Sequence, residues 1–397
     1  MKALLSLALL TALQASSPSP TIVALASSSS DTSLTADPTC QDTELMRLAS
    51  GDAWARLWLT DGAWNAVLGD ADTNGVFDLP SGIDALTWDS TSLTSKRRIL
   101  NLWFSSDTDF LGWKDGDVLR MNAAGGIELV YSEDQIRASL GTTSSIDLDA
   151  LERDAAGQIW YSLRDSVSVS SLGAIEDGDI LVYDPSAGTS WRHATESQVQ
   201  AWVDQALPGA GAFGDLKSLA FHPQTGELLF TIQSPSAADA SVFSVAGGGT
   251  LLPDFEEARW GFQRATELDA LTLSLDGPSQ PPVLTAEATY VTPGQTFGLT
   301  IRHAAPLGTL FGWMGSTRRL VTTQRGGFGF LAFDPGGATR NWPSAQAGRM
   351  NADAAGTVIT SYTVPTLPPG HAVLDLVFQA WDSSGAQIST PVLIRVL

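Results

Sequence analysis

The segment from Gly69 to Asp78 carries oxygen-bearing side chains at alternate positions before a glycine, which is the spacing of a calcium-binding loop. The predicted ligands occupy positions one, three, five, seven and nine of such a loop: Asp70, Asp72, Asn74, the backbone carbonyl of Val76, and Asp78. Ser81 stands where a bidentate Glu normally completes the site, so a residue from elsewhere, for example Asp84, would have to replace it. We therefore predict a weak calcium site, with a metal-free Asx-rich turn as the alternative.

Tryptophan is abundant, with 13 residues in the chain. Trp191 and Trp260 lie near predicted turns, where an exposed ring could stack on a sugar. Both are therefore candidate ligand contacts. The alternative for each is packing in the core or between domains, because large aromatic side chains are mostly buried.

Catalytic constellations are otherwise absent from the sequence. The four histidines show no metal-ligand spacing, and Ser316 lacks the Gly-x-Ser-x-Gly elbow of a hydrolase nucleophile. A glycine-rich phosphate loop that opens a helix is also missing. We predict no catalytic residues and no cofactor other than calcium.

A short motif recurs at intervals of about 50 to 70 residues, longer than the periods of helical solenoids. Its four copies are Asp84-Ala85-Leu86, Asp149-Ala150-Leu151, Lys217-Ser218-Leu219 and Asp269-Ala270-Leu271. After each of the first three copies come β-rich runs separated by Asp-Gly and other glycine-containing turns, which predicts four strands per unit. This pattern predicts an all-β, β-propeller-like repeat domain with about four blades, and a β-solenoid is the alternative.

The repeated acids Asp84, Asp149 and Asp269 could form an active-site cluster, because equivalent strands of a ring bring their ends together. A residue that every unit requires more often satisfies the same backbone turn in each unit. Lys217 at the third position also weakens a shared metal or acid–base role. We therefore predict a structural role for these acids.

The fourth unit stops one strand after it begins, at the apolar run Leu271–Leu275. Two unassigned apolar runs, Trp54–Thr60 and Trp64–Gly69, could complete its sheet from the other end of the chain. Such closure removes an exposed sheet edge that invites aggregation. We expect the strand around Leu271 to share a sheet with segments from the first eighty residues.

The domain boundaries follow from changes in composition. Residues 1–26 have the charged start and short apolar core of a secretory signal, with cleavage after Ala15 or Ala26. Residues 27–43 are predicted to be a disordered leader rich in Ser and Thr. The repeat domain is assigned to residues 44–277, a Pro-rich linker to 278–282 and a C-terminal β-sandwich to 283–397.

The charge balance limits the partners. With 43 acidic and 22 basic residues the formal net charge is −21, which argues against nucleic acids and anionic membranes as partners. No apolar stretch is long enough for a transmembrane segment. One cysteine excludes a disulfide within the chain, so stability must come from buried apolar area.

The repeat motifs DLDAL, GQIWYSL and DGDIL, with GDADTNGVFD ahead of them, resemble a repeat of secreted bacterial proteins that are mostly uncharacterised. The C-terminal motifs TPGQTFGLTI, ADAAGTVITSYTVP and LVFQAWDSSGAQIST resemble the sandwich domain of the same proteins. Lys217-Ser218-Leu219 departs from the repeat pattern. The resemblance implies export and a repeat-plus-sandwich organisation, and it implies no catalytic residues.

These observations predict a secreted, non-enzymatic binding or cell-surface structural protein whose partners are extracellular polysaccharides or envelope components. The alternative is a carbohydrate-recognising or carbohydrate-cleaving propeller. Cleavage would require two carboxylates of the set Asp84, Asp149, Asp179 and Asp269 to lie roughly 5–10 Å apart in an open pocket beside an exposed Trp.

Overall fold

A computed structural model gives an all-β chain with few helices. It describes residues 22–28, 44–50, 55–59, 82–88, 102–121, 127–234, 239–260, 262, 267–275, 282–304, 307–316, 323–324, 330–331, 340–341, 349–364, 374–382, 387–389 and 392–397. The predicted calcium loop, Gly69 to Asp78, lies outside these residues. The run Trp64–Gly69 does so as well.

Four four-stranded antiparallel sheets make up the repeat region, and we number them I to IV. Sheet I contains β4 (Ile83–Trp88), β5 (Leu102–Ser106), β6 (Val118–Met121) and β7 (Ile127–Tyr131). Sheet II contains β8 (Leu148–Arg153), β9 (Ile159–Leu163), β12 (Ile180–Asp184) and β13 (Thr189–Ala194). Sheet III contains β14 (Asp215–Phe221), β15 (Leu228–Gln233), β16 (Phe243–Ser244) and β17 (Thr250–Leu251). Sheet IV contains β18 (Leu268–Leu275), β1 (Ile22–Ser28), β2 (Leu45–Ala49) and β3 (Arg56–Leu59).

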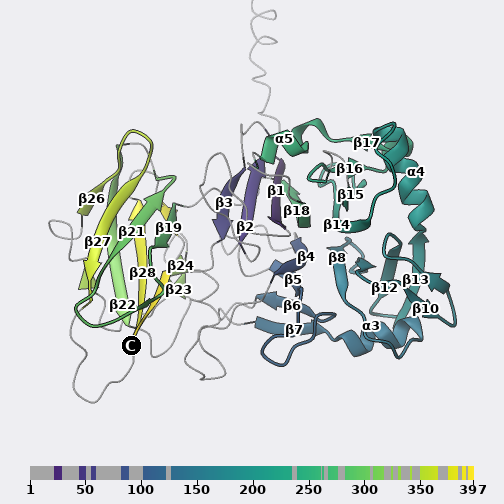
Figure 1. Cartoon of the computed structure of the whole chain (residues 1–397), viewed down its shortest axis with the longest axis horizontal. Helices are drawn as coiled ribbons and strands as arrows, with labels where there is room; N and C mark the ends of the chain where they lie inside the picture. Colours follow the sequence, from purple (N-terminus) through teal and green to yellow (C-terminus); the bar gives the residue numbers. More distant parts are fainter. Residues whose placement is uncertain are drawn as a thin grey trace, which may run out of the picture.

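The four sheets meet at their first strands. Each of β4, β8, β14 and β18, which we call the inner strands, contacts the other three. In Figure 1 these strands surround one central point, while β7, β13, β17 and β3 lie farther out. Apolar clusters fill the spaces between neighbouring sheets, so the inner strands are buried by the sheets on either side.

Sheet IV joins the two ends of the repeat region. Strand β18 pairs with β1 over its whole length, from Ile22 opposite Leu275 to Ser28 opposite Leu268. The expectation that the strand around Leu271 shares a sheet with the first eighty residues is therefore confirmed. Of the two runs named for this role, Trp54–Thr60 contains β3, whereas the strand paired directly with β18 was not foreseen.

The position of β1 corrects the predicted N-terminal boundaries. Its residues Val23 to Ala26 are at most 2% exposed, and Ser27 and Ser28 of the predicted leader belong to the same strand. The repeat region therefore begins at Ile22 in the structure, not at residue 44. Cleavage after Ala26 would remove most of β1, whereas cleavage after Ala15 leaves the strand intact.

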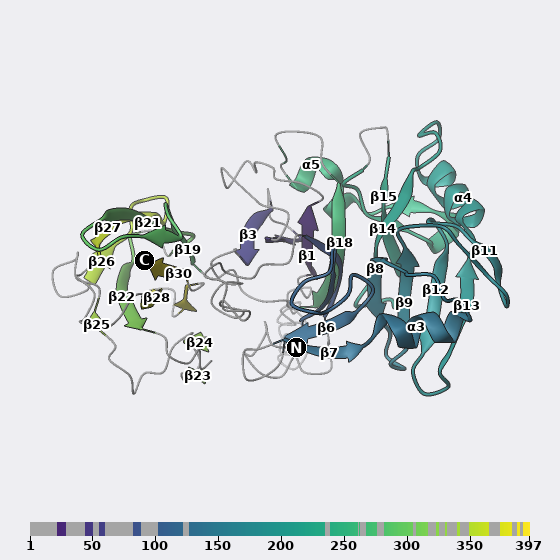
Figure 2. The ribbon, with the colours of Figure 1, turned by 60° about the horizontal axis from the view of Figure 1, so that its bottom comes forward.

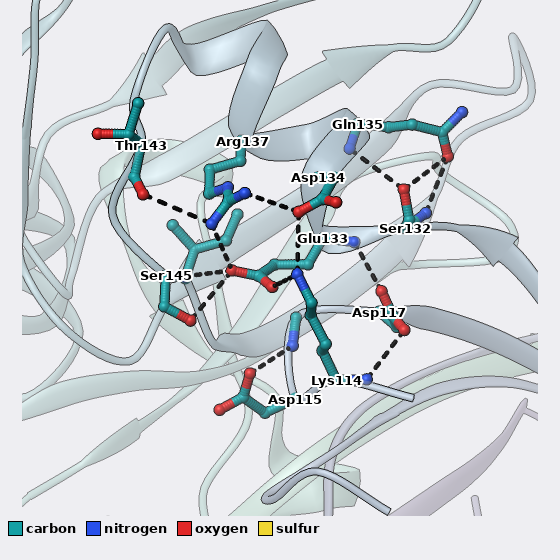
Figure 3. Close-up of polar contacts among 12 residues, drawn as sticks. Lys114, Asp115, Asp117, Ser132, Glu133, Asp134, Gln135, Arg137, Thr143 and Ser145 are labelled. Carbon is teal, nitrogen blue, oxygen red and sulfur yellow. Dashed lines mark hydrogen bonds and ion pairs between the residues drawn. The ribbon is translucent and has the colours of Figure 1, made fainter. Parts of the chain in front are cut away.

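A turn and a helix that recur in sheets I and II show that the repeat extends beyond the strands. The Asp-Gly-Asp turn before β6 ends in Asp117, whose carboxylate accepts hydrogen bonds from the backbone of Lys114 at 2.9 Å and of Glu133 at 2.7 Å (Figure 3). Glu133 is the first residue of α3 (Glu133–Leu140), so Asp117 ties the turn to the start of that helix.

The second copy of this arrangement repeats the same bonds. Asp179 accepts from the backbone of Glu176 at 3.1 Å and of Glu196 at 2.7 Å, and Glu196 begins α4 (Glu196–Ala206). Both helices start with a capping box, Ser132 with Gln135 and Thr195 with Gln198. The turn, the two strands that follow it and the helix therefore form one repeated unit.

The remaining strands form a second body beside the four sheets (Figures 1 and 2). A three-stranded sheet of β19 (Val283–Ala286), β21 (Thr296–Arg302) and β27 (Val358–Thr363) shares one apolar core with a larger sheet. The larger sheet contains β20 (Tyr290–Val291), β22 (Thr309–Ser316), β25 (Arg340–Asn341), β26 (Arg349–Asn351), β28 (Leu374–Asp382), β29 (Gln387–Ile388) and β30 (Val392–Val396). Short elements complete the described chain: β10 (Val167–Val169), β11 (Gly173–Ile175), β23 (Thr323–Gln324), β24 (Phe330–Leu331), α5 (Glu257–Trp260), and the 3-10 turns Ala246–Gly248 and Pro253–Phe255.

Candidate functional site at the ends of the inner strands

A β-bulge occurs at the same place in all four inner strands. The register with the second strand skips Asp84 in β4, Asp149 in β8, Lys217 in β14 and Asp269 in β18. A bulge leaves one residue unpaired and turns its side chain away from the regular alternation. The four repeated motif positions of the sequence are therefore the four bulged residues.

Hydroxyl groups on the second strands hold three of these bulges against the neighbouring sheet. Ser27 in β1, Ser162 in β9 and Thr231 in β15 each donate to a backbone carbonyl on the next inner strand. The acceptors directly precede bulged residues: Ile83 at 2.6 Å, Leu216 at 3.1 Å and Leu268 at 3.1 Å. In sheet I the equivalent Ser105 instead donates to its own turn, at Asp115 and Asp117.

Lys217 brings the bulged residues together. Its Nζ lies 3.0 Å from Oδ2 of Asp149, 3.2 Å from Oδ2 of Asp215 and 3.9 Å from Oδ1 of Asp269. The Lys217 side chain is only 12% exposed, so these ion pairs form where water screens them weakly. Three carboxylates from sheets II, III and IV therefore share one buried cation.

Burial also changes the protonation of two of these acids, Asp215 and Asp269. The pKa of Asp215 is raised to about 9, first by burial and then by its hydrogen bond with Asp149. The pKa of Asp269 is raised to about 7, mainly by burial, although Lys217 opposes the shift. One ammonium group thus offsets only part of the cost of collecting these carboxylates in a buried site.

A second group of acids adjoins the first. One carboxylate oxygen from each of Asp84, Asp107 and Asp147 lies within 4.8 Å of the other two. Asp107 follows β5 and Asp147 precedes β8, so the three come from neighbouring ends of sheets I and II. Arg164, which follows β9, pairs with Asp107 and lies 3.2 Å from Oδ2 of Asp147.

Asp84 differs from the other bulged acids because none of the ion pairs among the described residues reaches it. It is 4% exposed, and its Oδ2 has no hydrogen-bond partner among the described residues. Burial raises the pKa of Asp84 to about 9, and the charges of Asp269 and Asp107 add to the shift. Burial also raises the pKa of Asp147 to about 7.

The two groups form one contiguous set, which we call the axial cluster. Its members are Asp84, Asp107, Asp147, Asp149, Asp215, Asp269, Lys217 and Arg164. The repeated acids were expected to satisfy equivalent backbone turns, but the described partners of Asp149 and Asp269 are side chains, and Oδ2 of Asp84 has no hydrogen-bond partner among the described residues. Their structural role stays a prediction. Such a concentration of carboxylate oxygens can hold a hard cation or keep protons near neutral pH.

Sequence reasoning missed Asp107, Asp147, Asp215 and Arg164. A signal for two of them existed, because Asp147 and Asp215 each stand two residues before a bulged residue, where sheet IV has Glu267 and sheet I has Gly82. Asp107 and Arg164 occupy equivalent positions after the second strands of sheets I and II. Only the pairing register makes these equivalences visible.

The predicted sugar-stacking residues lie elsewhere. Trp260 is fully buried in the core between sheets III and IV, which rules it out as a contact for a ligand from solvent. Trp191 is 37% exposed on β13, the outermost strand of sheet II, with β12 and β9 between it and the inner strand. Neither tryptophan lies beside the axial cluster. Asp179, the remaining acid named for a cleavage site, accepts a hydrogen bond from the backbone of Glu196 at the start of α4.

Comparisons with known proteins identify no family. No protein-family model matches the sequence, and a search of curated proteins finds no match. Among solved structures, a fungal alcohol oxidase of the AA5 family in complex with copper is 11% identical, with a TM-score of 0.18 over 74% of this chain and 51% of that chain. The chain therefore spans about half the length of that oxidase.

Two further solved structures are similarly distant. The PapD-like domain 7 of human CEP192 is 11% identical, with a TM-score of 0.16 over 29% of this chain and 83% of that one. Red sea bream transglutaminase is 10% identical, with a TM-score of 0.19 over 95% of this chain and 57% of that one. These scores carry no argument about function. In the described part of the chain, no helix has the length and apolarity that a membrane span requires.

Proposed function

We propose that the chain is a secreted, non-enzymatic binding or cell-surface structural protein, built from a four-bladed β-propeller and a C-terminal β-sandwich. The mutual contacts of the four inner strands, the pairing of β18 with β1 and the matching bulges support the propeller. The shared core of the two C-terminal sheets supports the sandwich. The short apolar start after Met1-Lys2 supports export, as does the resemblance to secreted repeat proteins.

The observation that carries the non-enzymatic role is the burial of the only acid cluster that the described residues bring together at the inner strands. Asp84 and Asp149 are 4% and 1% exposed, and Asp149 is held by Lys217. Carboxylates that cleave a polysaccharide must meet the sugar, and an aromatic side chain usually supports the sugar beside them. Buried acids locked by a lysine fit a role in holding the scaffold and its ions.

Trp191 remains the candidate contact for an extracellular polysaccharide. It is a half-exposed aromatic ring on the outermost strand of sheet II, and the negative charge of the chain favours neutral or cationic polymers over anionic ones. A ligand at this position would bind to the rim of the ring of sheets, away from the axial cluster.

The test uses residues 16–397, screened against a panel of neutral and charged extracellular polysaccharides with calcium and with chelator. We expect binding that is weakened by Trp191→Ala, without release of new reducing ends. Release of reducing ends that Asp84→Asn abolishes would replace this proposal with carbohydrate cleavage. If the folded wild-type chain binds none of the polysaccharides, a purely structural surface component would be favoured.

A further inference from the structure

We propose that Asp84, Asp107 and Asp147 form a binding site for a divalent cation, with calcium as the preferred ion. The three carboxylate oxygens lie within 4.8 Å of one another, so a cation at their centre would lie within about 2.8 Å of each, close to the Ca–O distances of about 2.3–2.6 Å. The ligands are oxygens only, which are the ligands that calcium and magnesium select. None of these three ligands belongs to the Asp70–Asp78 segment, which lies outside the described residues, and the site does not depend on the identity of the protein's ligand.

The first argument beyond the cluster itself is a pair of buried oxygens without partners. Oδ2 of Asp84 and Oδ1 of Asp147 are both buried and have no hydrogen-bond partner among the described residues. A buried carboxylate oxygen without a partner costs free energy unless a proton or a cation satisfies it. Asp84 is also the bulged acid to which no described ion pair extends from Lys217, so the lysine leaves this side of the axial cluster uncompensated.

Arg164 positions two of the ligands without occupying all of their oxygens. It pairs with Oδ1 of Asp107 and lies 3.2 Å from Oδ2 of Asp147, which leaves Oδ1 of Asp147 and the second oxygen of Asp107 for a cation. Three carboxylates and one guanidinium have a formal charge of −2, which a divalent ion balances. Residues that orient the ligands in this way commonly strengthen a metal site.

Gly82 makes room for the site. It occupies the position in sheet I that Asp147 occupies in sheet II, two residues before the bulge. A Cβ atom added at Gly82 would lie 3.2 Å from Cβ of Asp107, which is closer than nearly all real contacts. A side chain at position 82 would therefore press on Asp107. Asp107 itself is 35% exposed, so an ion can exchange with solvent from its side.

The calcium preference follows from the looseness of the site. Three carboxylates on two different sheets give an irregular ligand set, and calcium accepts irregular geometry with six to eight ligands. Magnesium requires a near-ideal octahedron and gives up its water reluctantly. A bound ion would cross-link sheets I and II, so it should stabilise the folded chain in proportion to its concentration above the Kd.

The experiment measures calcium chloride binding to residues 16–397 by isothermal titration calorimetry, together with the shift in Tm, against magnesium chloride as the competing ion. Three variants separate the sites: Asp84→Asn and Asp107→Asn in the proposed site, and Asp72→Asn in the Asp70–Asp78 loop as the matched control. We expect Asp84→Asn and Asp107→Asn to lose one equivalent of calcium, or to weaken it by roughly tenfold or more, while Asp72→Asn retains that equivalent.

Loss of calcium binding in these variants should not be due to unfolding. Asp107 is partly exposed, and Asp84→Asn exchanges a buried carboxyl, whose Oδ2 has no hydrogen-bond partner among the described residues, for a neutral group of nearly the same shape. Calcium-free Asp84→Asn should therefore have a Tm close to that of the wild type. With calcium present, the wild type should have a higher Tm than Asp84→Asn, because only the wild type gains stability from the ion. Wild-type protein that binds no calcium, or binding that Asp84→Asn and Asp107→Asn leave unchanged, would overturn the proposal.

Discussion

Nζ of Lys217 lies 3.0 Å from Oδ2 of Asp149, the residue that holds the same motif position one repeat earlier. Lys217 is the one motif position that is not Asp, and it supplies the positive charge that pairs with the repeated acids Asp149 and Asp269. If the third copy also carried an Asp, sheets I to IV would place four buried carboxylates at the inner strands without a cation between them. Lys217 makes this convergence tolerable for Asp149, Asp215 and Asp269.

Replacement of Lys217 by Met should be strongly destabilising. It leaves Asp149 and Asp215 buried without their cation, and breaking a buried pair on one side typically costs about 3 to 5 kcal/mol. Urea unfolding followed by far-UV circular dichroism gives the free energy. Arg120→Met is the control, because Arg120 and its ion-pair partner Glu128 are both more than a third exposed, so a small change is expected. Similar losses for both variants would contradict the buried role of Lys217.

Glu152 should make stability depend on pH. It accepts hydrogen bonds from the Thr87 hydroxyl and from the backbone of Arg153 and Phe221, and so joins three inner strands. Complete burial raises its pKa from 4.5 to about 8, with a small addition from Asp154. The folded state therefore holds a proton that the unfolded state has lost between these two values. The free energy of unfolding should fall as pH rises through this window and then level off.

The matched variant for Glu152 is Glu152→Gln, which cannot ionise. Relative to this variant the wild type should lose on the order of a few kcal/mol between pH 4.5 and 8, because each pKa unit corresponds to about 1.4 kcal/mol. The measurement is urea unfolding at several pH values, with the exposed Glu128→Gln as the control. Parallel curves for wild type and Glu152→Gln would show that Glu152 does not titrate differently on folding.

Asp117 and Asp179 should each contribute more to the free energy of unfolding than the first Asp of their turns, Asp115 and Asp177. Asp117 accepts the backbone of Lys114 and of Glu133, the first residue of α3, whereas Asp115 accepts only the adjacent Gly116. Asp117→Ala should therefore cost about 1 to 2 kcal/mol, the usual cost of a lost helix cap. Asp179→Ala should cost at least as much, because it removes the equivalent two bonds and also the ion pair with Nε of Arg192 at 2.9 Å. Asp115→Ala is the control in urea unfolding, and an equal loss there would contradict this assignment.

The strands were predictable from the sequence because their signals are local. Alternation, Asp-Gly turns and the recurring Leu of the motif indicate four strands per unit, which is the number in each of sheets I to IV. The axial cluster was not predictable in the same way. A bulge changes the direction in which a side chain points. The residues around Asp84 and Lys217 show no pattern from which the bulges could have been predicted.

Two other errors have different physical causes. The apolar residues Val23 to Ala26 suit both a signal peptide and a buried strand. Because the residues before them resemble the start of a signal peptide, the sequence alone assigned them to that segment. Trp260 was expected near a turn, and it does end the short helix α5, but proximity to a turn says nothing about burial. Both outcomes were decided by contacts with β18 and its neighbours, which are distant in the sequence.

Strand β1 gives the last prediction, because sheet IV depends on it. Without residues 22–28, the edge of β18 is unpaired, and Ser27 no longer donates to Ile83 in sheet I. An exposed apolar edge of this kind promotes aggregation. A chain of residues 16–397 should therefore unfold cooperatively and remain monomeric in size-exclusion chromatography, whereas a chain of residues 29–397 should aggregate or lose cooperativity. If the proposed signal is cleaved, the N-terminus of the mature chain, read by mass spectrometry, should accordingly lie at or before Ile22. A stable, monomeric chain that begins at Ser29 would mean that sheet IV does not depend on β1.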